Sequence, residues 1–302
     1  MSAEPVSLQV EPLLRGKPIS PWREMAAYEA LWKHDKASFK TIADRFRQHP
    51  ESIPSELVTK QDIESALPKI EEHLRNIDLH DVGIRVRGSA DYPERLQDAA
   101  HPVELLYYRG WWDLIDAPKR IAVVGAREVS EDGIRRTRKL VRLLVRAGYT
   151  IVSGLARGVD TLAHETAIEE GGKTIAVIGT PITEYYPPEN RDLQDQIARD
   201  HLLVSQVPIC RYAAQDYRVN RLFFPERNAT MSALSHGTVI VEASDTSGTL
   251  VQARAAFHQG RKLFILDNNF HDAALTWPAR FEAQGAIRVR GMDISDIRAA
   301  LG

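Results

Sequence analysis

IAVVGAREVS at residues 121–130 and YTIVSGLARGVD at 149–160 are short apolar runs, each followed at once by a loop of small residues. In a parallel sheet, such strand–loop–helix units place their loops at the carboxyl ends of the strands, where open α/β proteins bind ligands. Glycines allow a close backbone approach, and the N–H groups that begin the next helix attract anions. An arginine in each loop makes phosphate the expected anion. The candidate residues are Gly125, Ala126 and Arg127 in the first loop and Gly154, Arg157 and Gly158 in the second.

The remainder of the chain repeats this unit or flanks it. From residue 121 onward, helical stretches alternate with the apolar runs IAVVG, TIVSG, TIAVIG, LLVSQ, TVIVEA, KLFIL and AIRVR. This alternation predicts an α/β fold with a Rossmann-like, doubly wound, mainly parallel sheet. Short strands within 83–110 are expected to extend that sheet. The sheet domain is expected at residues 81–302.

Helical periodicity between residues 22 and 78 predicts a small N-terminal helical domain at residues 1–80, which includes a proline-rich arm at 1–21. DNA binding is one role that such helices could have. Short helices with scattered charge more often serve packing or oligomerisation, and we favour that interpretation.

The composition is that of a globular protein in a reducing compartment. A formal net charge of −2 over 302 residues means that any nucleic-acid binding must come from a local basic patch. The single cysteine, Cys210, excludes an internal disulfide framework and a thiolate zinc site. No apolar run approaches 18 residues and no signal peptide is evident, so we expect a cytoplasmic protein that does not contact membranes. The sequence predicts no cofactor and no metal site.

RLFFPERN at residues 221–228 is the most informative further segment, because two cations flank an aromatic pair just before a helix. This combination suits stacking of a base while its backbone is held. One ring of the pair is expected to be buried as a core anchor. The loop after TVIVEA is a further small-residue loop at the start of a helix. The candidate residues of these two segments are Arg221, Phe224, Arg227, Asn228, Ser247 and Gly248.

Two other patterns have structural explanations that we prefer. A basic stripe lies along one side of the helix expected between residues 133 and 148, where it could contact DNA, but a helix that covers a sheet needs a solvated face. Asp160 and His164 share a helix face without further metal ligands nearby, so we expect His164 to hydrogen-bond within the fold or to line the pocket. The stripe consists of Arg135, Arg138, Lys139, Arg142 and Arg146.

Together these motifs resemble the DNA-processing protein A family, also called DprA or Smf. The matching pieces run in family order over about residues 83 to 266: Tyr92-Pro93, Leu106-Tyr107, VVGAR, SGLARGVDTLAH, TIAVIG, YYPPEN, FFPERN, VIVEASDTSGTL and GRKLF. The resemblance implies an extended Rossmann-like domain, often preceded by a small helical domain, that binds single-stranded DNA without cutting it. It further implies a homodimer formed through the Rossmann domain, which passes the strand to the RecA recombinase during natural transformation.

The resemblance also implies roles for individual residues. Arg127 would hold a phosphate, Phe224 would pack against a base, and Arg221 stands where the family commonly has a basic residue. Arg227 and Asn228 would shape the pocket. Close backbone approach would come from Gly154, Gly158, Ser247 and Gly248.

Several positions depart from the family pattern. Ala229 replaces an arginine, Gln206 replaces a glutamate, Asp267-Asn268 replaces Pro-Gly, and Thr276-Trp277-Pro278 replaces a glycine-asparagine loop. The sequence also stops at Gly302 without a C-terminal winged-helix domain. We therefore expect a divergent member, and these positions leave both DNA and a nucleotide open as the ligand of its pocket.

Two alternative functions follow from related families. DprA-like proteins of bacterial conflict systems act as antitoxins or nucleic-acid sensors paired with phosphoribosyltransferase-like toxins. Nucleotide phosphoribohydrolases use a Gly-Gly-x-Gly-Thr loop with a glutamate three residues after the threonine, where this chain has Gln252. A neutral amide cannot perform carboxylate acid–base chemistry, so we expect no hydrolysis. The prediction is a non-catalytic single-stranded DNA-binding protein that protects strands and loads recombinase.

Overall fold

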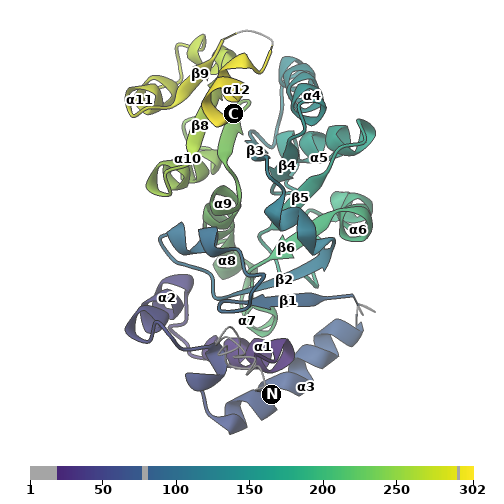
Figure 1. Cartoon of the computed structure of the whole chain (residues 1–302), viewed down its shortest axis with the longest axis vertical. Coiled ribbons are helices and arrows are strands. Elements are labelled where there is room, and N and C mark those ends of the chain that lie inside the picture. The colour runs from purple at the N-terminus through teal and green to yellow at the C-terminus, as the bar shows by residue number, and fades with distance from the viewer. Residues whose placement is uncertain (1–18, 77–80, 291–292) are drawn as a thin grey trace, which may run out of the picture.

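The computed structural model describes residues 19–76, 81–290 and 293–302 (Figure 1). Within these ranges nine strands form one sheet in the order β1-β2-β6-β5-β4-β3-β7-β8-β9. Strands β3 to β9 run parallel, which confirms the mainly parallel α/β sheet. They are β3 (Arg120–Val124), β4 (Thr150–Ser153), β5 (Thr174–Ile178), β6 (Leu202–Ser205), β7 (Gly237–Ile240), β8 (Lys262–Leu266) and β9 (Ile287–Val289).

Two further strands extend the sheet at one edge, as the sequence predicts. Strand β2 (Leu105–Gly110) pairs antiparallel with β6, and β1 (Gly83–Val86) pairs antiparallel with β2. The expected proline-rich arm falls almost wholly on residues 1–18 and lies outside the described ranges.

Helices cover both faces of the sheet because residues of each central strand alternate between two apolar cores. Ile121 and Val123 of β3 pack with one group of helices, whereas Ala122 and Val124 pack with the other. The first group is α4 (Glu131–Arg146), α5 (Val159–Glu169) and α12 (Ser295–Leu301), and the second includes α9 (Phe223–Leu234), α10 (Thr249–His258) and α11 (Trp277–Ala283) (Figure 1).

The N-terminal helices pack against the edge of the sheet that carries β1 (Figure 1). They are α1 (Pro21–Leu31), α2 (Phe39–Gln48) and α3 (Lys60–Asn76). Later in the chain come α6 (Arg191–Asp200) and the short helices α7 (Ile209–Ala214) and α8 (Tyr217–Asn220). Trp32 lies 6.1 Å from Phe223, ring centroid to ring centroid. The buried Glu29 carboxylate accepts hydrogen bonds from the Tyr107 hydroxyl (2.5 Å) and the Ile209 N–H (2.6 Å). These contacts support the packing role, while the domain boundary after residue 80 stays a prediction.

The order of the strands reverses beside β3. From β3 the chain builds β4, β5 and β6 on one side, then crosses over to build β7, β8 and β9 on the other. In open α/β sheets this reversal leaves a crevice at the carboxyl ends of the two central strands, and ligands bind there. The fold thus positions the loops after β3 and β7 side by side. Of the helices described, none is both long and apolar enough to cross a membrane.

Candidate functional site

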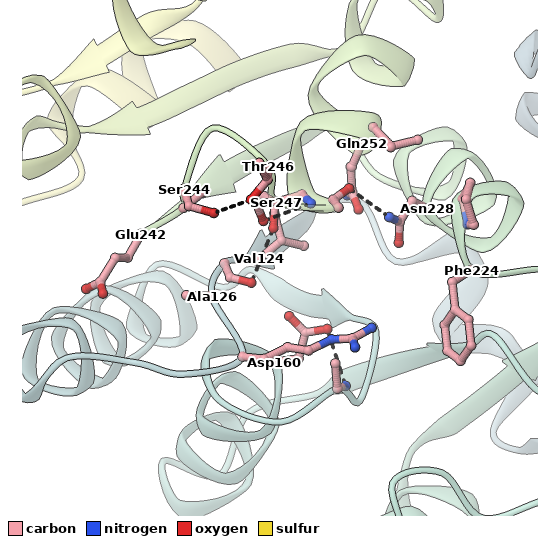
Figure 2. A pocket seen from close by; sticks show the side chains of 18 of the residues that line it. Val124, Ala126, Asp160, Phe224, Asn228, Glu242, Ser244, Thr246, Ser247 and Gln252 are labelled. Atoms are coloured by element: carbon pink, nitrogen blue, oxygen red, sulfur yellow. Dashed lines mark hydrogen bonds between the residues drawn. The ribbon is translucent and has the colours of Figure 1, made fainter. Parts of the chain in front are cut away.

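A cavity of about 1190 Å³ opens at this reversal point. Its walls come from the loops after β3, β4 and β7 and from the α8–α9 segment, with Val124, Ala126, Phe224 and Ser247 among the lining residues (Figure 2). The sequence-predicted residues that line it are Gly125, Ala126, Arg127, Arg221, Phe224, Arg227, Asn228, Ser247 and Gly248. The cavity therefore brings residues 125–127 together with two segments, 221–228 and 247–248, that follow more than 90 residues later in the chain.

Arg127 and Arg221 are the two exposed arginines of the cavity wall. Within the described part of the chain, neither guanidinium makes a hydrogen bond or an ion pair, so both are available to an anion. Carboxylates also line the cavity, but Glu242 is engaged: it accepts from the Ser130 hydroxyl at 2.7 Å and from the Ser130 N–H at 3.3 Å. Unpaired guanidinium groups beside an open cavity are suited to phosphate.

Arg227 differs from these two, because it is only 4% exposed. Its guanidinium donates to the carbonyl oxygens of Gly154 and Val177 (2.8 Å to Val177) and to the Asn228 side chain (2.9 Å). Burial lowers the pKa of Arg227, and the charge of Asp160 opposes that shift. Arg227 thus ties the loop after β4 and strand β5 to α9 and shapes the wall. Because its guanidinium donates to protein atoms, it is not available to a ligand.

Asn228 continues this connection into the third loop. Its Nδ2 donates to the Gly248 carbonyl oxygen at 3.2 Å (Figure 2). The Ser247 hydroxyl accepts from the Thr249 N–H at 3.2 Å and so fixes the turn that leads into α10. The Ser247–Gly248 loop is consequently held against α9, with its backbone facing the cavity.

The glycines of the predicted site have two different roles. A side chain at Gly154 would overlap the Arg227 guanidinium, and one at Gly158 would overlap the carbonyl oxygens of Ala126 and Arg127. These two glycines make room for the protein itself rather than for a ligand, a distinction that sequence spacing cannot make. At Gly248, by contrast, nothing lies within 4 Å of an added Cβ, so that backbone is open to a ligand.

Arg157 does not join the cavity. Its guanidinium pairs with Glu189, and it is absent from the lining. Of the two loop arginines, only Arg127 lines the cavity.

Aromatic side chains form part of the wall. Phe224 rests against the backbone of Gly179, where a side chain would overlap its ring, and lies 5.4 Å from the Tyr186 ring, centroid to centroid. Phe223 is buried, which confirms that one ring of the pair anchors the core. Tyr186, Tyr212 and Tyr217 also line the cavity, and the sequence analysis did not select them.

Asp160 lies in the cavity wall, and His164 follows it one helical turn further along α5, outside the lining. Asp160 is buried and accepts from the Gly154 N–H at 3.2 Å, and burial raises its pKa although Arg227 opposes the shift. His164 is fully buried, contacts the Thr174 hydroxyl through Nδ1 at 2.7 Å, and has its pKa lowered by burial to about 3. His164 is thus held within the fold, as the preferred interpretation states. The described residues contain no group of three or more potential metal ligands.

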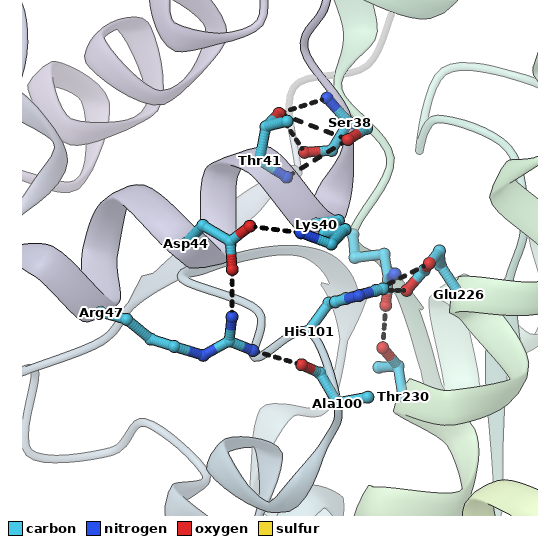
Figure 3. A network of polar contacts seen from close by, with 10 residues as sticks. Ser38, Lys40, Thr41, Asp44, Arg47, Ala100, His101, Glu226 and Thr230 are labelled. Atoms are coloured by element: carbon cyan, nitrogen blue, oxygen red, sulfur yellow. Dashed lines mark hydrogen bonds and ion pairs between the residues drawn. The ribbon is translucent and has the colours of Figure 1, made fainter.

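The basic stripe of α4 also agrees with the preferred interpretation. Arg135 pairs with Asp132, while Arg142 and Arg146 pair with Glu170 at 2.6 and 3.3 Å. Among the positions that depart from the family pattern, Gln206 is buried and accepts from the Thr230 hydroxyl. Thr230 lies on the same helix as Glu226, whose carboxylate contacts the His101 ring (Figure 3). Trp277 is fully buried, and its Nε1 donates to the Ala243 carbonyl at 3.0 Å. These departures are accommodated inside the core.

The comparisons with known proteins agree on one family. The family model described as "DNA recombination-mediator protein A" matches residues 83–301. The chain is 31% identical to the DNA processing protein DprA of Bacillus subtilis over 227 residues, 75% of this chain and 74% of that one. It is 39% identical to DprA of Streptococcus pneumoniae over 181 residues, 60% of this chain and 61% of that one. The similarity spans 44% of the Synechocystis protein Smf, so the chain covers only part of some relatives.

Solved structures give the same answer. The X-ray structure of DprA from Streptococcus pneumoniae matches with a TM-score of 0.71 and 27% identity, over 94% of this chain and 98% of that one. A structure of DNA processing protein A from Helicobacter pylori, whose description concerns a single-stranded DNA binding mode, matches with a TM-score of 0.60 and 25% identity. It covers 72% of this chain and 95% of that one. The names of the matched proteins favour a DNA-processing function over the antitoxin and phosphoribohydrolase alternatives.

Proposed function

The chain belongs to the DNA recombination-mediator protein A family, and from this premise we propose that it binds single-stranded DNA in the cavity beside β3 and β7. The observation that supports the proposal most strongly is the pair Arg127 and Arg221, whose guanidinium groups have no ion pair within residues 19–76, 81–290 and 293–302 and line one cavity with the Phe224 ring. A cation for the backbone and an aromatic face for a base are the two components of sequence-tolerant strand binding. The likeness to the Helicobacter pylori protein supports the same ligand.

How exposed each cavity residue is determines whether it contacts the strand or supports the wall. Arg127 and Arg221 neutralise phosphates, Phe224 stacks on a base, and the open backbone at Gly248 lets a phosphate approach the start of α10. Arg227 and Asn228 hold these parts in register. Because phosphate contacts dominate, affinity falls steeply as salt rises and depends little on base sequence.

We propose that binding is followed neither by strand cleavage nor by hydrolysis of a nucleotide's glycosidic bond. The cavity position that a phosphoribohydrolase would fill with a glutamate carries the buried Gln252, whose Nε2 donates to the Thr238 hydroxyl at 3.2 Å. The carboxylates of Asp160 and Glu242 accept hydrogen bonds from backbone N–H groups and are therefore occupied in the fold.

The wider role proposed is that of a cytoplasmic homodimer that protects strands and loads the RecA recombinase during DNA uptake and recombination. The description of the matching family model, a recombination mediator, supports this role. The N-terminal helices are proposed as a packing module because α1 shares a core with β1 and β2.

The test is fluorescence anisotropy with a labelled single-stranded oligonucleotide at low salt. Wild type is expected to bind, and Arg127→Ala or Arg221→Ala to weaken binding about tenfold each, as loss of a charge-assisted contact does. Arg135→Ala is the matched control, because that arginine is exposed but paired with Asp132. Absence of wild-type binding at low salt, or equal loss in all three variants, would refute the proposal.

A further inference from the structure

Exposed apolar side chains gather beside the cavity. Six large hydrophobic residues of the described chain are prominently exposed, and two of them, Tyr217 at 67% and Tyr186 at 44%, line the cavity itself. An exposed ring on a protein surface is usually of no consequence when it stands alone. Here both rings border the same cavity as Phe224, and an aromatic face left in water at a binding site is available for stacking.

The backbone of the α8–α9 segment places the Tyr217 ring and the Arg221 guanidinium on the same side of the helix. The Arg221 N–H donates to the Tyr217 carbonyl at 3.2 Å, and the Phe224 N–H donates to the Arg221 carbonyl at 3.4 Å. Tyr217, Arg221 and Phe224 thus stand at positions i, i+4 and i+7 of nearly continuous helical backbone. Residues at this spacing share one face, and all three line the cavity. The face spans about 10 Å at 1.5 Å per residue.

The two ends of this face are held differently. Phe224 is fixed between the Gly179 backbone and the Tyr186 ring. Tyr217 is anchored by its own helix, since Asp216 accepts from the Arg218 N–H at 2.8 Å and caps α8. The Arg218 guanidinium lies 5.7 Å from the Tyr217 ring centroid and adds a further cation next to that ring. The order along the face is therefore ring, cation, ring.

We propose that Tyr217, together with Tyr186, extends the contact made by Phe224 into an aromatic track on which successive bases of a single strand stack while Arg221 holds the phosphate between them. This inference rests on the proposed function and deepens it, because it places bases as well as phosphates along α8 and α9. A duplex cannot use the track, since its bases are already stacked on each other. The track is tolerant of sequence because every base has a flat face.

Stacking and phosphate contact differ in how they respond to salt and to the base. Loss of a phosphate contact lowers the slope of log affinity against log salt concentration, by about 0.7 for one contact on a single strand. Loss of a stacking ring leaves the slope unchanged and matters only where a base is present. These two readouts separate Tyr217 from Arg221.

The experiment compares two labelled strands by anisotropy across a salt series: oligothymidylate, and the same strand with abasic sites at its central positions. The variants are Tyr217→Ala, Tyr217→Phe and Leu222→Ala. Leu222 is the matched control, because it belongs to the same segment, is 69% exposed and does not line the cavity.

The expected result is that Tyr217→Ala weakens oligothymidylate binding roughly fivefold or more, near the lower end of measured base stacking. Its affinity for the abasic strand and its salt slope stay those of wild type, Tyr217→Phe retains affinity, and Leu222→Ala changes nothing. Wild-type affinity of Tyr217→Ala for both strands would overturn the track, as would equal loss on both strands or an equal effect of Leu222→Ala. If wild type binds neither strand, the proposed function fails, and the track fails with it.

Discussion

The outer face of α4 and the wall of the cavity are both rich in cations, yet they differ in how those cations are partnered. On α4, Arg142 and Arg146 share the Glu170 carboxylate, and Arg135 pairs with Asp132. In the cavity, Arg127 and Arg221 have no such partner among the described residues. Three of the five stripe cations are thus held by carboxylates, whereas Arg138 and Lys139 have no ion pair among the described residues. The cavity is set apart because its two free guanidinium groups line one cavity volume together with the Phe224 ring.

The largest effect is expected at the third cavity arginine, which belongs to the fold. Arg227→Met keeps most of the volume but leaves the buried Asp160 carboxylate without its compensating charge, so the free energy of unfolding should fall by about 3–5 kcal/mol. Urea unfolding measures this free energy. Arg142→Met is the control, and its free energy of unfolding should stay within about 0.5 kcal/mol of wild type. A wild-type urea midpoint for Arg227→Met would show that Arg227 is not structural.

Gly154 and Gly248 separate residues needed for stability from residues needed for binding. Gly154→Ala places a methyl group against the Arg227 guanidinium and should cost about 1–3 kcal/mol of unfolding free energy. Gly248→Ala meets no atom and should leave stability unchanged while weakening strand binding, since its backbone faces the ligand. Thermal unfolding and anisotropy on both variants test this. The reverse pattern would contradict the assignment of the two glycines.

The buried wall behind the cavity should also respond to pH. Burial lowers the pKa of His164 to about 3 in the folded protein, below the ordinary value near 6.5 of the unfolded chain. The unfolded state therefore binds the extra proton between pH 6.5 and 3, and His164 reduces stability as pH falls through that window, by up to about 1.4 kcal/mol per pH unit. Urea unfolding at several pH values should show a weaker decline for His164→Gln. Identical slopes for the two proteins would contradict the burial argument.

The smallest effect comes from unpairing the cations of α4. Glu170→Gln releases Arg142 and Arg146, so strand affinity at low salt should rise about two- to fivefold, and the gain should vanish as salt screens the surface. Anisotropy at low and high salt measures this change. A gain larger than the loss caused by Arg127→Ala would place the principal site on α4 and break the comparison.

Much of the fold could be predicted because each short apolar run corresponds to a strand that is buried on both faces. All seven runs after residue 120 became parallel strands, and the segment 83–110 gave the two edge strands. The loops at the strand ends were found for the same reason, since a glycine-rich turn after a buried strand has one position in this architecture.

The site was only partly predictable, because local sequence does not report long-range partners. Arg157 looks equivalent to Arg127 in sequence, but Glu189 lies near it only in the folded chain. The buried Arg227 guanidinium donates to a carbonyl group of the loop after β4 and to one of strand β5, which come near it only in the folded chain. Tyr217 could have been found from its spacing to Arg221 and Phe224, whereas nothing in the sequence places Tyr186 beside Phe224.

The most direct test of the central claim removes two positive charges from each region and compares the salt dependence of strand binding. We expect that Arg127→Ala combined with Arg221→Ala lowers the slope of log affinity against log salt by about 1.4, or two single-strand phosphate contacts. Arg142→Ala combined with Arg146→Ala, whose net charge is the same, should keep the wild-type slope. Equal slopes for the two double variants, or a larger drop for the α4 pair, would show that the strand does not bind in the cavity.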